Sequence, residues 1–524
     1  MMLPLQLVMK RGTIHLCKIS ILFLDRDFEH DVYELVKSFY PGADIRTSYK
    51  EIDKECGLKF RIEKSGNSFL IRYDCEGHKG VAGASVIEGQ SSDALICCSR
   101  EKVQEDEVRA DAHEIRRQNK DSIKYALYHV LVRLTGRTLP WGNLTGIRPA
   151  KLVMGMLESG MKNTEAAKEM RERYLVSPQK AALAITIANR EREILKDIDY
   201  ENGYSLYIGI PFCPSICLYC SFSSYPLKQW QAKVDAYLEA LCREIRAVAS
   251  MMKSRKLDAI YIGGGTPTTL EPDQLRRLLD AVGESFGYDG LLEFTIEAGR
   301  PDSITREKLS AVREYPVTRI SVNPQTMNQK TLDIIGRRHT VEETKQAFTL
   351  ARMYGYNNIN MDLIVGLPGE DISMVKNTLE EVRALGPDSL TVHSLAVKRA
   401  ARLNMFRDQY QEMTFENNQE IMDMTMRTAY EMEMGPYYLY RQKNMKGNFE
   451  NVGYAKVDKA GIYNILIMEE KQPIIALGAG GSSKLVFDHG NRIERVENVK
   501  DVTNYIARID EMIERKRAGI QTWL

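Results

Sequence analysis

Three cysteines near the middle of the chain have a spacing that suits an inorganic cofactor. Cys213, Cys217 and Cys220 form a CxxxCxxC pattern within IPFCPSICLYCSF. Structural zinc usually takes four ligands, and no fourth Cys or His lies near them. A cubane iron–sulfur cluster has four irons, so three thiolates leave one iron open to a bound substrate or cosubstrate. The pattern therefore predicts a [4Fe–4S] cluster. The alternative, three unligated cysteines, is disfavoured by so tight a group.

Residues that could bind a ligand also lie on other predicted strands or directly after them. The Gly263–Thr266 run contains three glycines, and a backbone without Cβ atoms can approach a ligand closely. Glu297 ends a predicted strand, where its carboxylate can accept hydrogen bonds from ligand hydroxyls. Asp362 lies inside the apolar stretch Ile359–Val365 and needs a partner or a ligand there. The alternative interpretations are a plain tight turn and a satisfied structural carboxylate.

The elements that must position these residues alternate between strands and helices. The predicted strands are Tyr204–Phe212, Ala259–Ile262, Leu292–Glu297, Arg319–Asn323, Ile359–Val365 and Ser389–Ala396. The predicted helices between them are Gln229–Met252, Pro272–Phe286, Thr305–Tyr315, Gln329–Ile335, Val341–Tyr354 and Ile372–Leu385. This alternation predicts an α/β fold, a parallel sheet wrapped by helices in a partial (β/α)6 barrel. Ligands bind such folds at the carboxyl ends of the strands.

The regions on either side of the barrel are predicted as separate parts. We expect a small α+β domain at 1–118, a helical connector at 119–200, the barrel at 201–400 and a C-terminal α+β extension on the substrate side at 401–524. The first part should contain strands Ile19–Leu24, Lys59–Ile62, Ser68–Tyr73 and Ala94–Cys97 and helix Glu29–Phe39. The connector should contain helices Asp121–Thr135, Glu165–Arg173 and Pro178–Leu195. The extension should contain helices Glu416–Met434 and Val502–Arg517, strands Tyr437–Tyr440 and Ile462–Met468, and a glycine-rich turn in LGAGGSSKL.

Composition narrows the class of protein. The 524 residues are 44% hydrophobic and carry a net charge of +1, which indicates a globular protein and gives no sign of a nucleic-acid partner. Lys10, Arg11 and Lys18 interrupt the apolar start, and no other run is long and apolar enough to span a bilayer. We therefore expect a cytoplasmic protein without a membrane segment. The remaining cysteines are scattered, which suits a reducing compartment: Cys17, Cys56, Cys75, Cys97, Cys98 and Cys242.

Several short motifs together resemble a known family. IPFCPSICLYCSF, GGGTPT, TIEAGRPD, NPQ, IGRRHT and NMDLIVGLPGE occur in this order. They are similar to motifs of radical S-adenosylmethionine (SAM) enzymes, and in particular of the oxygen-independent coproporphyrinogen III oxidases (coproporphyrinogen dehydrogenases). WGNLTGIRPAKL and PYYLYRQKN resemble the long, HemZ-type branch of that family. The resemblance is strong from about Tyr204 onward and weak before about Leu139.

The resemblance implies the site. It implies a [4Fe–4S] cluster on Cys213, Cys217 and Cys220. It also implies SAM contacts from Tyr207, Tyr219, Gly264, Gly265, Thr266, Glu297, Gln325, Arg337, Asp362 and His393. Arg337 suits the methionine carboxylate, because a guanidinium binds carboxylates in a bidentate way. A lone histidine such as His393 is also often a satisfied core residue. We further expect an aromatic and cationic group to face a substrate carboxylate, formed by Tyr437, Tyr438, Tyr440 and Arg441.

The implied activity is oxidative decarboxylation. Two propionates of coproporphyrinogen III would become vinyl groups, giving protoporphyrinogen IX in anaerobic haem biosynthesis, with electrons from a small protein such as a flavodoxin or ferredoxin. Phe222 departs from the CxxxCxxCxC of well-studied oxidases and matches related haem chaperones. The alternative is therefore a haem-binding chaperone that keeps the cluster and SAM site. A third hypothesis, a radical SAM enzyme acting on RNA, comes from the extra N-terminal domain and is weakened by the neutral charge. The sequence leaves the electron donor, the electron acceptor, a second SAM and the oligomeric state open.

Overall fold

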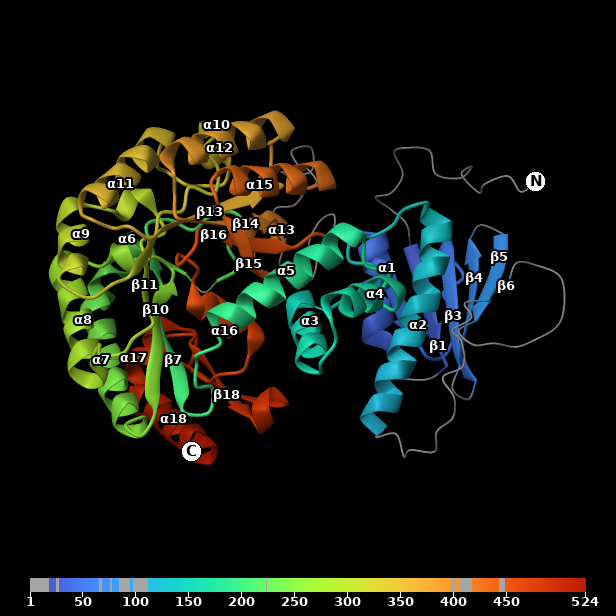
Figure 1. Cartoon of the computed structure of the whole chain (residues 1–524), viewed down its shortest axis with the longest axis horizontal. Coiled ribbons are helices and arrows are strands. Elements are labelled where there is room, and N and C mark those ends of the chain that lie inside the picture. The colour runs from blue at the N-terminus through green and yellow to red at the C-terminus, as the bar shows by residue number, and fades with distance from the viewer. Residues whose placement is uncertain are drawn as a thin grey trace. The chain divides into compact units, whose positions relative to one another are not determined.

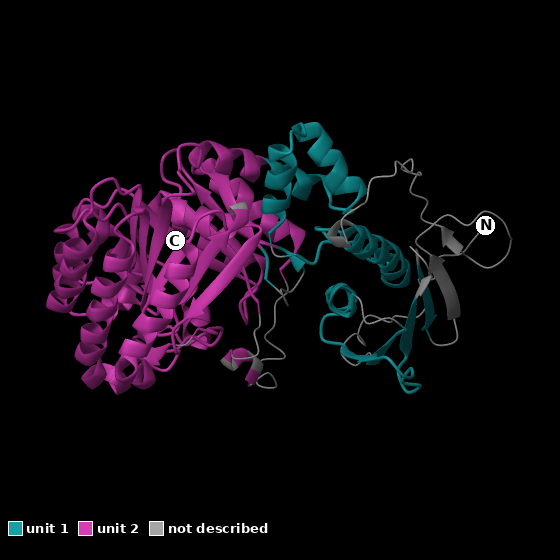
Figure 2. Cartoon of the chain, turned by 90° about the horizontal axis from the view of Figure 1, so that it is seen from below, with its two compact units in different colours: residues 1–185, 441–449 teal, residues 186–440, 450–524 magenta. Residues whose placement is uncertain are grey.

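The structure is a computed structural model. It describes residues 18–24, 28–65, 68–75, 78–83, 95–97, 112–146, 148–222, 224–396, 401–405, 417–442 and 448–524. Cys17, Cys98 and the predicted helix start at Glu416 lie outside these residues. The chain divides into two compact units, residues 1–185 with 441–449 and residues 186–440 with 450–524 (Figure 2). The four-part division remains a prediction.

The first unit contains a mixed six-stranded sheet with two helices packed on it (Figure 1). The strand order is β2-β1-β3-β4-β5-β6, and apolar residues of α1 and α2 share one core with β1, β3 and β4. This confirms the N-terminal α+β region. Sequence reasoning misses β2 (DIRTS) and β5 (HKGVAG), because polar and glycine residues hide their strand character. The bounds are β1 Lys18–Phe23, α1 Glu29–Phe39, β2 Asp44–Ser48, β3 Leu58–Ser65, β4 Ser68–Cys75, β5 His78–Gly83, β6 Leu95–Cys97 and α2 Ala112–Thr135.

Three further helices follow α2: α3 Pro149–Glu158, α4 Asn163–Glu172 and α5 Pro178–Ile194. α4 and α5 agree with the predicted helices Glu165–Arg173 and Pro178–Leu195 to within a few residues. α3 has no counterpart among the predicted helices. Pro149 occupies the first turn of α3, where a missing N–H costs nothing. The tryptophan of the preceding loop, Trp141, is fully buried.

The second unit is built on an eleven-stranded sheet, and the six central strands form the predicted partial barrel. The order β7-β10-β11-β12-β13-β14 is parallel throughout. In Figure 1 the helices α7, α8, α9, α11 and α12 follow one another along the outer side of these strands, with α10 beside α12. The strands are β7 Gly203–Ile210, β10 Lys256–Gly264, β11 Glu293–Glu297, β12 Arg319–Ser321, β13 Ile359–Val365 and β14 Ser389–Ser394. The helices are α7 Val234–Met251, α8 Pro272–Phe286, α9 Arg306–Arg313, α10 Gln329–Ile334, α11 Val341–Met353 and α12 Ile372–Leu385.

The two edges of this sheet are completed by the C-terminal part of the chain. β17 (Ile474–Leu477) pairs parallel with β7, and β18 (Ser482–Phe487) and β19 (Arg492–Glu497) extend that edge. β16 (Asn451–Ala455) pairs antiparallel with β14, and β15 (Gly435–Tyr440) pairs antiparallel with β16 at the edge of the sheet. Strand Tyr437–Tyr440 is thus confirmed. The Met-rich helix is α15, Gln419–Glu431, and the last predicted helix is divided into α17, Val502–Ala507, and α18, Ile509–Trp523.

One predicted strand is wrong. Ile462–Met468 lies in a helix, α16, which runs from Ile462 to Glu469. A short apolar run cannot be assigned from periodicity alone, because a buried strand and a buried helix have the same composition. Tyr463 and Ile465 on this helix are buried, and Tyr463 packs against tyrosines of β7 and β10. Tertiary packing therefore decides the conformation.

A buried ion pair holds the glycine-rich turn after β17. Glu244 on α7 and Lys516 on α18 are 0% and 1% exposed, and Lys516 Nζ lies 2.6 Å from Glu244 Oε1. The backbone N–H of Gly478 and the hydroxyl of Tyr505 also donate to Glu244, at 2.8 and 2.6 Å. The N–H groups of residues 478 to 481 are all engaged within the protein, so this turn offers no anion site. In the described part of the chain, no helix is long and apolar enough to cross a membrane.

A pair of buried carboxyl groups makes the stability of the fold depend on pH. Glu191 on α5 and Glu469 on α16 are both buried. Burial raises the pKa of Glu191 well above its usual value, and the neighbouring Glu469 carboxyl adds to this. A raised pKa in the folded state means that the contribution of Glu191 to stability is complete below its unfolded pKa of about 4.3 and is lost as the pH rises through the folded pKa.

We predict that Glu191→Gln removes this loss, because the amide has the same shape and no charge to bury. The thermal midpoint of the variant should exceed that of the wild type at about pH 8.5, by about 2–4 °C for each kcal/mol gained, and should not exceed it at about pH 5. Circular dichroism across this range measures the effect. Glu193→Gln on the same helix, at an exposed position, is the control. Parallel pH profiles for Glu191→Gln and the wild type would contradict the assignment.

Candidate functional site

The cysteine loop begins where β7 ends, and the glycine run after β10 lies against it. Phe212 and Cys213 form a short strand, β8, that pairs with β9, Tyr225–Pro226. The N–H of Gly265 donates to Ile210 O and that of Thr266 to Phe212 O, both at 2.7 Å. A Cβ at Gly265 would lie 2.5 Å from Phe212 O. Glycine is therefore required there, and the predicted Gly264–Thr266 segment supports the cysteine loop directly.

Each of the three thiols faces a polar group within hydrogen-bonding distance of its sulfur atom. The hydroxyl of Thr266 lies 3.7 Å from Cys213 Sγ, Arg300 Nη1 lies 3.6 Å from Cys217 Sγ, and the hydroxyl of Ser224 lies 3.6 Å from Cys220 Sγ. Burial raises the pKa of the Cys213 thiol to about 11, and the charges of the other two thiols add to this. The three sulfur atoms are therefore close enough to interact, and a bound metal centre would favour the thiolate form of Cys213.

These residues fit an iron–sulfur cluster better than a single ion. Among the described residues, no three His, Cys, Asp or Glu side chains are placed to hold one metal ion. A single zinc ion needs every thiolate at about 2.3 Å from one point. A cubane instead takes each thiolate on a different iron, which allows a wider spacing, and hydrogen bonds to sulfur are a normal means of tuning it. Three thiols on one loop, each beside a polar group, match that requirement.

The connection between α10 and α11 holds the loop from the other side. The N–H of Leu218 donates to Ile335 O and the hydroxyl of Ser215 to Gly336 O, both at 2.9 Å. Arg337 follows and is 4% exposed. Its Nη1 donates to the Tyr219 hydroxyl at 3.2 Å.

The second amino group of Arg337 is also engaged. Its Nη2 donates to the carbonyls of Gly299, at 3.2 Å, and Asn323, which lie beyond the ends of β11 and β12. Both Nη atoms therefore connect Tyr219 of the cysteine loop to the strand ends. Binding of a ligand carboxylate by Arg337 remains a prediction, and within the described residues its buried Nε has no hydrogen-bond partner.

Two carboxylates at the strand ends have different electrostatic environments. Burial raises the pKa of Glu297 to about 7, against a hydrogen bond from Tyr261 that lowers it, and the charge of Asp362 raises it further. For Asp362, burial would raise the pKa, but the His393 ring and a 2.7 Å bond from the Asn360 amide hold it below its usual value. At neutral pH Asp362 is therefore charged while Glu297 is close to half-protonated. Such a divergence is typical of functional carboxylates.

Glu297 also borders the glycine run. A Cβ at Gly263 would lie 2.9 Å from Glu297 Oε2. The glycine run therefore contacts the cysteine loop at Gly265 and Thr266 and the carboxylate at Gly263. The loop of the three predicted cluster ligands and the carboxylate are thus joined by four consecutive residues.

Gln325 has a strained backbone. Its φ is +69°, in the left-handed region that costs a non-glycine residue about 1–3 kcal/mol. Its N–H donates to Asp362 O and its carbonyl accepts from Ile364 N–H, both at 2.9 Å, so β13 imposes the conformation. Within the described residues, the buried Oε1 of Gln325 has no hydrogen-bond partner. A strained residue with a free buried acceptor next to Asp362 is consistent with a ligand contact.

Stacked tyrosines line the inner side of the strands. Tyr207 and Tyr261 stack with ring centroids 6.2 Å apart, and Tyr261 stacks on Tyr463 at 4.5 Å. On the other side, Tyr440 stacks with Tyr438 at 6.4 Å, and its hydroxyl lies 3.3 Å from His393 Nδ1. Tyr207 and His393 thus both belong to the barrel interior. His393 has two polar neighbours there, because its Nε2 lies 3.8 Å from Asp362 Oδ2.

The three tyrosines of the expected group lie together. The ring centroids of Tyr437 and Tyr438 are 4.8 Å apart and those of Tyr438 and Tyr440 are 6.4 Å apart. The hydroxyl of Tyr437 accepts a hydrogen bond from Asn464. Arg441 belongs to the first unit and donates to the carbonyl of Leu144 at 2.7 Å.

Sequence reasoning misses three residues that complete the site: Tyr261, Arg300 and Tyr463. A signal exists for Tyr261, which lies two positions before Gly263 and so shares its side of β10. Arg300 lies in TIEAGRPD, three residues after Glu297, but nothing in the sequence pairs it with a cysteine. Tyr463 is hidden by the wrong assignment of α16 as a strand.

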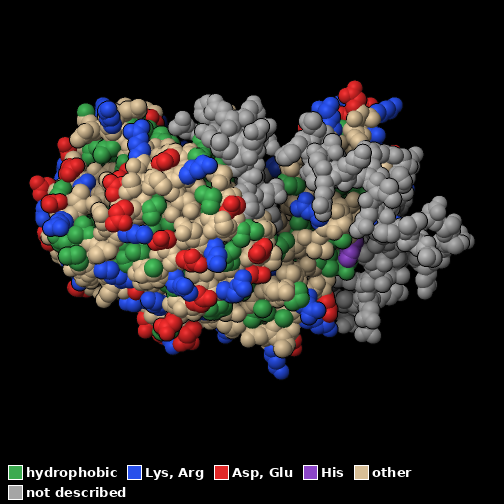
Figure 3. Space-filling view, turned by 90° about the horizontal axis from the view of Figure 1, so that it is seen from above, with side chains coloured by type: hydrophobic (Ala, Val, Ile, Leu, Met, Phe, Trp, Pro, Cys, Tyr) green, Lys and Arg blue, Asp and Glu red, His purple; other side chains and the backbone are tan. Residues whose placement is uncertain are grey.

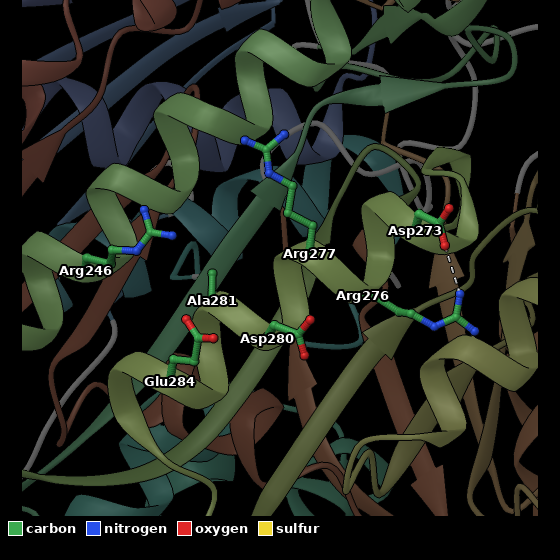
Figure 4. Close-up of a pocket in the computed structure, with 7 residues that line it drawn as sticks. All are labelled: Arg246, Asp273, Arg276, Arg277, Asp280, Ala281 and Glu284. Atoms are coloured by element: carbon green, nitrogen blue, oxygen red, sulfur yellow. Dashed lines mark hydrogen bonds and ion pairs between the residues drawn. The ribbon is translucent and has the colours of Figure 1, made fainter.

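A shallow groove of about 360 Å³ lies elsewhere, on the outer side of α7 and α8 (Figure 4). Arg276 pairs with Asp273 at 3.1 Å and with Glu314 at 2.7 Å, and Arg277 pairs with Glu239. Exposed ion pairs of this kind contribute little and indicate a solvated surface. None of the predicted site residues lines this groove, whose lining is Arg246, Asp273, Arg276, Arg277, Asp280, Ala281 and Glu284.

The chain is similar to a family model and to several known proteins. The model of the Radical SAM superfamily matches residues 207–382. The oxygen-independent coproporphyrinogen-III oxidase-like protein HemZ of Bacillus subtilis is 40% identical over 407 residues, 77% of this chain and 81% of that protein. Heme chaperone HemW of the same organism is 37% identical over 195 residues, 37% of this chain and 51% of that protein. The solved coproporphyrinogen III oxidase (HemN) of Escherichia coli is 24% identical with a TM-score of 0.49, over 62% of this chain and 73% of that one.

We predict that anaerobically reconstituted protein holds about four irons and absorbs broadly in the visible, because three thiolates suffice to anchor a cubane. Alanine at Cys213, Cys217 or Cys220 should abolish both signals. Cys242→Ala is the matched control, since this buried cysteine on α7 lies outside the loop. Iron analysis and absorption spectra provide the measurement. Anaerobic protein that carries stoichiometric zinc and no iron would refute the prediction.

Proposed function

This chain belongs to the radical SAM superfamily, among its HemZ-like oxygen-independent coproporphyrinogen-III oxidase relatives, and we propose that it converts two propionates of coproporphyrinogen III into vinyl groups. The observation that carries this proposal is the junction of three thiols and a carboxylate through Gly263–Thr266. The close relationship extends over 81% of the HemZ relative, so it includes much more than the cofactor-binding segment.

Atoms and electrons balance in the proposed reaction for each propionate separately. Each propionate loses one hydrogen atom, one carbon dioxide and one electron, and leaves a vinyl group. A [4Fe–4S] cluster with SAM supplies hydrogen-atom abstraction when both are bound. The electron requires an acceptor outside the protein, and a small reducing protein such as a flavodoxin or ferredoxin is the proposed donor for the cluster.

The chain's own residues would position and shield these groups. Cys213, Cys217 and Cys220 would hold the cluster. Tyr207, Tyr219, Gly264, Gly265, Thr266, Glu297, Gln325, Arg337, Asp362 and His393 are the proposed SAM contacts. Asp362, charged at neutral pH, suits a ribose hydroxyl or the ligand's ammonium group. The tyrosine-lined interior between Tyr207 and Tyr440 offers flat apolar surfaces of the kind that bind a macrocycle.

The haem chaperone is the second candidate. Phe222 lies at the end of the loop and is 72% exposed, so it does not fill the core. Unlike the thiol of the cysteine that other oxidases have at this position, its side chain cannot donate hydrogen. The chaperone relative is 37% identical over 195 residues, but the match covers only 51% of that protein. The oxidase proposal is favoured because the relationship to the HemZ relative covers 77% of this chain and 81% of that protein. An RNA substrate is less supported, since basic and acidic side chains are interspersed over the described surface on the face that Figure 3 shows.

The decisive experiment is product analysis under strictly anaerobic reduction with coproporphyrinogen III and SAM. We predict protoporphyrinogen IX and 5′-deoxyadenosine together, with about two SAM cleaved per product in the coupled limit because two propionates react separately. Cys217→Ala is the negative control. Tight haem binding without decarboxylation, while an electron donor demonstrably reduces the cluster, would favour the chaperone.

We also predict pH-dependent SAM affinity. If Glu297 binds SAM as a carboxylate, affinity should rise as the pH increases through about 7 and then level off, because protons compete below the pKa. Glu297→Gln should flatten this profile, and Asp362→Asn should weaken binding at every pH, by roughly thirty- to a thousandfold for a loss of about 2–4 kcal/mol. Anaerobic calorimetry from about pH 6 to 8 measures this, with Glu297→Gln also reporting the ligand's own titration. An unchanged profile in Glu297→Gln would remove Glu297 from the site.

A further inference from the structure

Arg300 lies just beyond β11 and connects a carboxylate to a predicted cluster ligand. The residue is 3% exposed. Its Nε and Nη2 donate to the two oxygens of Asp302 at 2.9 and 2.8 Å, a bidentate pair. Its Nη1 donates to the hydroxyl of Ser215 at 3.2 Å and to Cys217 Sγ at 3.6 Å. One buried cation therefore contacts both Ser215, whose hydroxyl is hydrogen-bonded to the backbone, and one of the sulfur atoms of the loop.

This contact distinguishes Cys217 from the other two thiols. Cys213 and Cys220 face the neutral hydroxyls of Thr266 and Ser224. A hydrogen bond from a charged donor is roughly twice as strong as one between neutral groups. Despite its burial, Asp302 and the thiols raise the pKa of Arg300, so the guanidinium remains charged.

Asp302 has further charged or titratable neighbours. Asp302 Oδ1 also lies 4.0 Å from Nδ1 of His339, which is fully buried, and the charge of Arg337 acts on Asp302 as well. Arg300 is the buried member of the pair, since its side chain is 4% exposed while that of Asp302 is 22% exposed. A buried charge is costly unless neighbouring charges compensate it. Asp302 supplies one such charge, and a negatively charged cluster on Cys217 would supply another.

We infer that the Arg300–Asp302 pair sets the reduction potential of the cluster through Cys217. The inference rests on the proposed function, because it requires the cluster to be bound. Reduction adds one negative charge to the cluster, and a nearby cation that donates to a ligand sulfur stabilises the reduced state. Loss of the cation should shift the potential to more negative values. Loss of the Asp302 charge should shift it to more positive values.

The experiment compares Arg300→Met, Arg300→Lys and Asp302→Asn with the wild type, all reconstituted anaerobically and without substrate. Dye-mediated titration followed by electron paramagnetic resonance gives the midpoint potential, and iron analysis with thermal unfolding reports cluster content and folding. The matched control is Arg276→Met, since Arg276 also pairs with two carboxylates but lies on the outer side of α8.

We expect a more negative potential for Arg300→Met, a smaller shift in the same direction for Arg300→Lys, a positive shift for Asp302→Asn and none for Arg276→Met. A merely structural pair would change cluster content or the thermal midpoint without shifts of opposite sign. If Arg300→Met takes up no cluster, Arg300→Lys and Asp302→Asn decide, because both keep a cation at position 300. Wild-type potentials in both of these variants would overturn the inference. A wild-type protein without a cluster would overturn the proposed function itself.

Discussion

Parallel pairing of six strands is the constraint on which the candidate site depends. It places the carboxyl ends of β7, β10, β11, β12 and β13 at one edge of the sheet, although these strands are far apart in the sequence. The cysteine loop has little regular structure of its own. Its shape comes from hydrogen bonds to the segments that leave the neighbouring strands, above all from the close contact of Gly265 with Phe212. A slip of one residue in the pairing of β7 with β10 would move the glycines away from the loop.

Much of this arrangement can be predicted from the sequence, because its signals are local. The cysteine spacing, the glycine run and the six apolar strands each occupy fewer than about ten residues, and the parallel topology then follows from their alternation with helices. What cannot be predicted depends on partners distant in the chain. Arg337 suggests a ligand carboxylate by its chemistry, yet its contacts are with Tyr219 and backbone carbonyls. The helical state of α16 likewise depends on the tyrosines against which Tyr463 packs.

The charges around the strand ends are arranged in opposed pairs. Asp302 faces Arg300, Asp362 faces His393, and burial raises the pKa of Glu297 to about 7. In a medium of low dielectric constant, each of these interactions is stronger than it would be in water, and each unpaired charge is more costly. A change of charge within the site is therefore costly unless a neighbouring group compensates it. The change in charge on binding a cationic ligand would fall mainly on Glu297.

The pairing of β17 with β7 has a consequence for how the protein is made. Ser205 pairs with Ile474, so this parallel contact joins residues about 270 positions apart. On the ribosome, the strand that leads into the cysteine loop emerges long before its outer neighbour, at a synthesis rate of about 5–20 residues per second. For that interval the edge of β7 presents unpaired backbone groups next to three thiols. Completion of the nascent barrel, and a stable setting for the three predicted cluster ligands, must therefore wait until β17 has been translated.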